Sequence, residues 1–139
     1  KREAVCSWLI RKGMTSGKER FLITNTDGNI FAIRKGDKSG VQLNSVKEKL
    51  ISAKKNSLVF YHNHPLSGSF SYADAETLNT YQALKEMIAV GHNGTVYSLK
   101  IGKRIPEKEF RELRYTCTEP DLIKKLVKNY GWHYSIKER

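Results

Sequence analysis

Cysteine is scarce in this chain of 139 residues, and long hydrophobic runs are missing. Cys6 and Cys117 stand far apart and no Cys-x-x-C pair occurs, which argues against a disulfide-rich scaffold and against a zinc ribbon. We expect two buried thiols, with a single Cys6–Cys117 disulfide as the alternative. No apolar run approaches the roughly 20 residues that a membrane-spanning helix needs, so no membrane segment is predicted.

Acidic residues are few relative to basic ones: 14 Asp and Glu stand against 25 Lys and Arg, which gives a net charge of +11. The excess lies in residues 1–60 and 103–139, whereas residues 61–102 are nearly neutral. Two basic flanks suit an anionic partner: an acidic protein substrate, an acidic inhibitor or immunity protein, or nucleic acid. A basic surface that serves only solubility is an equal alternative.

The length fits one domain over residues 1–139 with a single core. Hydrophobic residues make up 39% of the chain, so it is predicted to fold. Because the first residue is Lys1 rather than methionine, we expect a piece of a longer protein. The expected setting is a reducing cytosol.

Apolar periodicity and turn residues predict helices that alternate with strands. A hairpin is expected around Asp27-Gly28, and the helix after it is expected to be capped by Asn44 or Ser45. The expected helices cover residues 3–12, 44–55, 71–85, 106–113 and 119–130, and the expected strands cover residues 21–24, 30–33, 57–65, 87–90 and 95–102. This order predicts an α/β or mixed α+β fold, with helices packed on a mixed sheet.

Two histidines close the most apolar of these strands, in the stretch "VFYHNHPLSGSFSYADAETL". His62 and His64 are two residues apart, so both imidazoles point to one side of the strand. Asp74 follows in the first turn of the next helix, and a strand end facing a helix start is a common place for ligands. Two imidazoles and one carboxylate leave a fourth position open, as in catalytic zinc sites.

Helix capping offers a simpler explanation for part of this pattern. Ser71-x-x-Asp74 has the spacing of a capping box, and an acidic residue in the first turn complements the helix dipole. Capping accounts for Ser71 and Asp74 but leaves His62 and His64 at the mouth of a buried strand unexplained. The two interpretations are compatible.

The stretch "HNHP", followed by a short spacer and "SYAD", resembles the JAMM motif of the JAB/MPN metallohydrolases. The Gly/Ser loop is most similar to RadC-like members and to JAB domains of phage structural and polymorphic toxin proteins. The similarity covers residues 15–102 and leaves residues 103–139 as a basic helical extension. The spacer from Pro65 to Phe70 is one residue shorter than the usual JAMM spacer.

The resemblance implies a JAB/MPN-like, cytidine-deaminase-like fold and a zinc ion (Zn2+) held by His62, His64 and Asp74. It also implies a glutamate general base on the early strand, for which Glu19 is the candidate. Ser71 would stabilise the oxyanion of the reaction. A carboxylate base suits a metal-activated water, which still has a proton to lose.

The expected function is therefore a zinc-dependent hydrolase that cleaves a peptide or isopeptide bond, with Glu19 as the base and Ser71 at the oxyanion. It is expected as the effector (toxin) domain of a larger protein. A metal-dependent nuclease acting on DNA or RNA is an alternative, which the basic flanks favour. A non-catalytic JAB-like binding scaffold is another, although a complete set of ligands argues against it.

Overall fold

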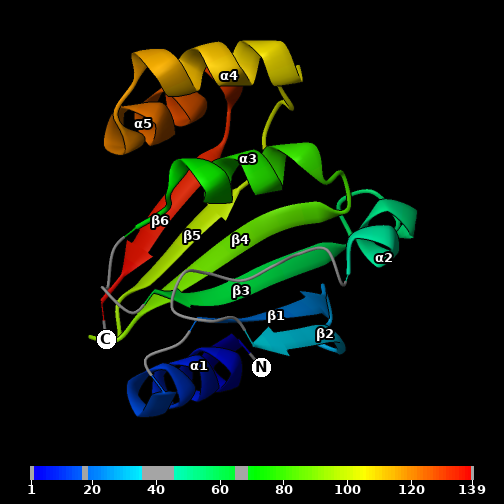
Figure 1. Cartoon of the computed structure of the whole chain (residues 1–139), viewed down its shortest axis with the longest axis vertical. Helices are drawn as coiled ribbons and strands as arrows, with labels where there is room; N and C mark the ends of the chain where they lie inside the picture. The colour runs from blue at the N-terminus through cyan, green and yellow to red at the C-terminus, as the bar shows by residue number, and fades with distance from the viewer. Residues whose placement is uncertain (1, 17–18, 36–45, 65–68, 139) are drawn as a thin grey trace.

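The computed structural model describes residues 2–16, 19–35, 46–64 and 69–138, and within them the protein has a mixed α+β fold (Figure 1). Five helices surround one six-stranded sheet. The helices are α1 (Arg2–Ser16), α2 (Lys47–Ser52), α3 (Tyr72–Thr80), α4 (Glu107–Thr116) and α5 (Glu119–Tyr130). The strands are β1 (Arg20–Asn25), β2 (Ile30–Lys35), β3 (Leu58–His64), β4 (Leu84–Gly91), β5 (Val96–Lys100) and β6 (His133–Lys137).

The strand order is β2-β1-β3-β4-β5-β6. Strands β3 and β4 are parallel, and every other neighbouring pair is antiparallel. A parallel pair needs a crossover connection, and α3 lies within it. The carboxyl end of β3 and the start of α3 are therefore brought to the same edge of the sheet, as Figure 1 shows.

Alternating side chains divide the core between the two faces of the sheet. On one face, Phe21, Phe60 and Met87 belong to a large cluster that also includes buried residues of α3, α4 and α5. On the other face, Tyr61 and Ile88 belong to a smaller cluster with residues of α1. Helix α1 covers this second face, and α3 crosses the first (Figure 1). The central strands are thus buried on both sides.

Several sequence predictions are confirmed. The hairpin turns at Asp27-Gly28, where Gly28 has a φ of 89° that favours glycine. Helix α5 ends at Gly131, which adopts the left-handed conformation. Cys6 and Cys117 are buried free thiols.

None of the described helices has the length and apolar character that crossing a membrane requires.

Other predictions are wrong. The helix expected over residues 71–85 ends at Thr80, because Leu84 and the residues after it pair with β3 as strand β4. Strand β6 was missed, since its sequence lies directly behind a helix and is short. The α2 N-cap is Val46 without a side-chain bond, and the expected caps Asn44 and Ser45 lie outside the described residues.

Candidate metal centre

The last residues of β3 point two imidazoles toward the face that α3 crosses. His62 and His64 continue the row of Phe60, so the apolar row of this strand turns polar at its carboxyl end. The two rings lie 4.4 Å apart, centroid to centroid. His62 is buried and His64 is half-buried.

The start of α3 brings a carboxylate to these imidazoles. Ser71 and Asp74 form the predicted capping box: the Ser71 Oγ accepts from the Asp74 backbone N–H (3.1 Å), and the Ser71 N–H donates to Asp74 Oδ2 (3.0 Å). The same carboxylate places Oδ1 at 3.6 Å from His62 Nε2 and Oδ2 at 3.3 Å from His64 Nε2. The capping box is therefore confirmed, and it holds the Asp74 carboxylate beside both imidazoles.

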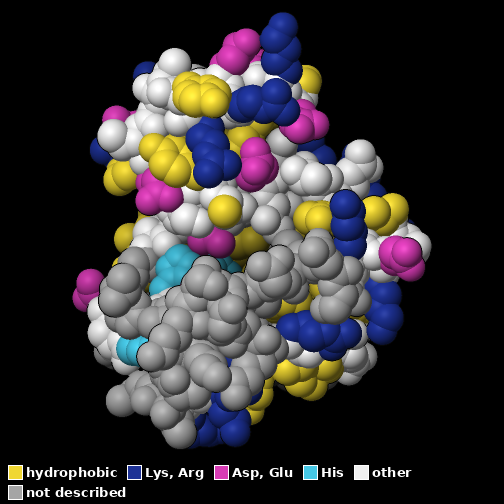
Figure 2. All heavy atoms as spheres, viewed as in Figure 1, with side chains coloured by type: hydrophobic (Ala, Val, Ile, Leu, Met, Phe, Trp, Pro, Cys, Tyr) yellow, Lys and Arg dark blue, Asp and Glu magenta, His cyan; other side chains and the backbone are white. Residues whose placement is uncertain are grey.

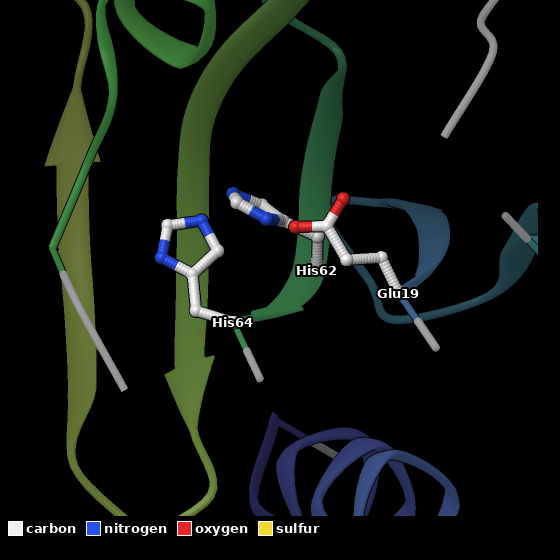
Figure 3. Close-up of side chains that lie close together, drawn as sticks. All are labelled: Glu19, His62 and His64. Atoms are coloured by element: carbon white, nitrogen blue, oxygen red, sulfur yellow. The ribbon is translucent and has the colours of Figure 1, made fainter. Parts of the chain in front are cut away.

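Glu19 reaches the same place from the residue just before β1. Phe21 is paired with His62, so Glu19, two residues earlier, lies on the same face of the sheet. Figure 3 shows the Glu19 carboxylate and the two imidazoles gathered at the end of β3. One ligand atom from each of Glu19, His62 and His64 lies within 4.8 Å of the others. In Figure 2, histidine side chains reach the surface beside an acidic side chain on this side of the molecule.

The surroundings shift the pKa of each of three groups. Burial lowers the pKa of His62 to about 4, so its imidazole is neutral near pH 7. Burial alone would raise the pKa of Asp74, but the imidazoles of His62 and His64 and the Ser71 N–H outweigh it and hold that pKa well below its usual range. Partial burial raises the pKa of Glu19, with the Asp74 carboxylate adding to the shift and His64 opposing it.

These residues fit a metal ion on two observations. The buried Nε2 of His62 has no hydrogen-bond partner among the described residues, although buried nitrogens nearly always have one. Ligand bonds of about 2.0–2.1 Å in a tetrahedral arrangement place neighbouring donors about 3.3–3.4 Å apart, close to the two His–Asp distances. Two imidazole nitrogens with carboxylate oxygens are a donor set that zinc accepts.

No family model, curated protein or solved structure matches this chain. Its function is therefore inferred from the residues of the centre itself.

Two residues that position the centre were not singled out from the sequence. The buried Asn63 accepts the Arg20 backbone N–H at 2.6 Å, which fixes the start of β1, and with it Glu19, beside the end of β3. Glu119 accepts the Tyr72 backbone N–H at 2.8 Å and so ties α5 to the start of α3. An asparagine inside a buried strand was a usable signal for the first. The second has no sequence signal, because it depends on a contact 47 residues apart.

Proposed function

We propose that this chain is a zinc-dependent hydrolase of the JAB/JAMM type that cleaves a peptide or isopeptide bond. The observation that carries the proposal is that Glu19 gathers with His62 and His64, and that Asp74 lies beside the same two imidazoles. These side chains come from the residue before β1, from β3 and from α3. A buried imidazole nitrogen without a partner is costly, and such a cost is more readily understood at a functional site than in a core.

We propose a JAB/MPN-like fold on the same grounds. Three features support it: a hairpin that Glu19 directly precedes, a strand that ends in the two histidines, and a helix that crosses to a parallel strand. The resemblance expects its motif residues on elements of these types. The six-stranded mixed sheet is compatible with this architecture.

The proposed roles follow from position and chemistry. His62, His64 and Asp74 would hold zinc, which when bound polarises a carbonyl and makes a water easier to deprotonate. Glu19 accepts the proton of the attacking water and gives it to the departing amine nitrogen. Its raised pKa makes it a better proton acceptor than an ordinary exposed carboxylate.

Ser71 has a hydrogen to spare for the reaction. A hydroxyl has one donor and two acceptor positions, and the bond from the Asp74 N–H uses an acceptor. The hydroxyl hydrogen can therefore be donated to the oxygen on which negative charge develops. This use needs no change in the capping box.

A metal-dependent nuclease is the second candidate, and the observation that favours it is the net charge of +11. The two candidates share a metal centre and differ in substrate. A panel of linear peptides, an isopeptide-linked conjugate, plasmid DNA and RNA separates them, with Glu19→Gln as the inactive control. We expect Glu19-dependent cleavage of a peptide or isopeptide bond, whereas Glu19-dependent cleavage of nucleic acid would make the nuclease the correct choice.

Metal content tests the centre directly. We expect one zinc per chain after dialysis against zinc, measured by elemental analysis. Loss of a positioning partner alone lowers metal affinity by about 10–100-fold, so His64→Ala and Asp74→Ala should lower it by more than about 100-fold. His133→Ala is the matched control, because it removes an exposed histidine from β6. A wild-type chain that stays metal-free would contradict the proposal.

A further inference from the structure

A large groove adjoins the candidate metal centre. It has a volume of about 810 Å³ and lies between the start of α3, helix α5 and strand β6. Ser71, the candidate oxyanion donor, is one of the residues that line it. Ser71 also exchanges two hydrogen bonds with Asp74, so this residue connects the groove lining to the centre.

Hydrogen bonds between the walls hold the groove in place. On one side, Glu119 of α5 accepts the backbone N–H of Tyr72, and the Tyr72 hydroxyl donates to the Cys117 carbonyl (2.6 Å). On the other side, the hydroxyls of Ser69 and Tyr134 are 3.0 Å apart and share a hydrogen bond. The groove is thus attached to the helix that carries Asp74, so that binding there and alignment at the centre are linked.

The walls combine an apolar floor with a basic rim. Ile123 and Val127 of α5 and Tyr134 of β6 supply apolar surface, and Val127 is 39% exposed. Lys124 and Lys128 are exposed, and neither forms an ion pair with any residue in the described part of the chain. Figure 2 shows hydrophobic and basic side chains interleaved over this helical end of the molecule.

The spacing of these residues fits an extended peptide. Lys124 and Lys128 are one helical turn apart, about 6 Å along the axis, and alternate residues of an extended chain are about 6.6 Å apart. Side chains of alternate peptide residues can therefore meet both lysines, while the residues between them turn the other way. Ile123 and Val127 repeat the same spacing beside the lysines and suit apolar side chains.

We propose that this groove binds an extended peptide segment of the substrate in which acidic and apolar residues alternate, and that it leads the adjoining bond to the metal centre. The part of this proposal that brings a scissile bond to the metal centre rests on the hydrolase function proposed above. Charge complementarity with Lys124 and Lys128 selects the acidic residues. The aliphatic side chains favour a peptide over nucleic acid, because stacked bases need exposed aromatic platforms. Of the two aromatic residues that line the groove, Phe70 is buried and Tyr134 is half-buried.

Binding is measured by fluorescence anisotropy on metal-free protein in EDTA. The probe is a labelled peptide Gly-Ser-Glu-Leu-Glu-Val-Gly-Ser, compared with the same peptide carrying Lys for Glu and with a ten-nucleotide oligothymidylate. We expect the acidic peptide to bind at least about tenfold more tightly than the basic one. Equal binding of the two peptides, or tighter binding of the oligonucleotide, would overturn the proposal.

The variants locate the binding. Lys124→Glu combined with Lys128→Glu should weaken the acidic peptide at least about tenfold. Val127→Ser should weaken it about three- to tenfold through lost apolar contact. Lys108→Glu with Lys125→Glu makes the same charge change at exposed helical positions outside the groove lining and should have little effect. Equal losses in the two double variants would refute a specific groove.

The two proposals fail separately. Peptide binding is observed without metal or turnover, so its absence leaves the hydrolase function standing. Conversely, the protein could bind the acidic peptide while binding no zinc and cleaving no substrate. That result would refute the hydrolase function and support a groove that only binds peptides. If both hold, the Lys124→Glu, Lys128→Glu variant should raise KM for an acidic substrate and leave kcat unchanged.

Discussion

Each face of the sheet carries acidic side chains away from full exposure to solvent: Glu86 is buried on one face, and Glu19 and Asp74 are half-buried on the other. The partners of these carboxylates differ between the two faces. On the face that α1 covers, the Glu86 carboxylate is 1% exposed and receives the Arg2 guanidinium at 2.8 Å and the Ser98 hydroxyl. On the other face, the carboxylates of Glu19 and Asp74 stand around two imidazoles. No Lys or Arg among the described residues forms an ion pair with either of them.

The two clusters differ in whether the chain itself supplies partners for their buried polar groups. A buried carboxylate is tolerated when it is paired and hydrogen-bonded, and Glu86 has a cation and a hydroxyl supplied by the chain. At the other cluster the imidazole of His62 is neutral, and its buried Nε2 lies 3.6 Å from Asp74 Oδ1 without a hydrogen-bond partner in the described chain. The cation that the proposed function requires would supply this nitrogen with a partner. We interpret Glu86 as structural and the His62 cluster as functional on this ground.

The largest expected effect comes from exchanging the two glutamates for glutamine. Glu19→Gln removes the proposed base and should lower turnover about 10²–10⁴-fold while zinc stays bound. Glu86→Gln leaves Arg2 facing a neutral amide and should lower the free energy of unfolding by about 1–3 kcal/mol, with turnover per folded molecule unchanged. The measurements are steady-state kinetics on the cleaved peptide and urea unfolding. If Glu86→Gln lost turnover and Glu19→Gln did not, Glu86 would be the functional carboxylate and Glu19 the structural one.

The next effect is a dependence of stability on pH in the metal-free protein. The pKa of His62 is about 4 in the folded chain and near 6.5 when it is unfolded, so between these values the unfolded state binds more protons. The stabilisation is complete above about pH 6.5 and is lost as the pH falls toward 4, by about 3 kcal/mol in all. Urea unfolding in EDTA at pH 7.5 and 4.5 measures this loss.

His62→Gln is the control for this dependence, because glutamine is polar and does not titrate. Its free energy of unfolding should change less between the two pH values than that of the wild type. If the free energy of unfolding changes equally in the two proteins, His62 is solvated. The contrast with Glu86, whose carboxylate has partners within the chain, would then disappear.

The sequence was sufficient to predict the local parts of the centre. The strand that ends in His62 and His64 and the capping box of Ser71 and Asp74 follow from short-range pattern. The place of Glu19 was expected from the resemblance to the JAMM motif, and the structure brings it to the two histidines. Period-two placement of the histidines and the capping spacing are each fixed within four residues, which is why they could be predicted.

What depends on distant contacts could not be predicted. The residues after Thr80 continue a helical pattern, but pairing with β3 makes them strand β4, since burial in the sheet outweighs local propensity. Strand β6 exists because His133 to Lys137 can pair with β5, and the groove beside the centre depends on it. The Arg2–Glu86 pair joins residues that are 84 positions apart, and no sequence pattern predicts it.

The smallest expected effect concerns that pair. Arg2→Ala leaves the Glu86 carboxylate buried with the Ser98 hydroxyl as its remaining hydrogen-bond partner in the described chain, which destabilises the fold. Because the Arg2 side chain is 51% exposed, solvent screens the pair, and we expect a loss of about 1–2 kcal/mol in the free energy of unfolding. Glu3→Ala is the matched control on the same helix, since the Glu3–Lys137 pair is exposed on both sides and should contribute little. If Arg2→Ala costs no more than Glu3→Ala, Glu86 is not held by a cation, and the difference between the two faces of the sheet must lie in the imidazoles alone.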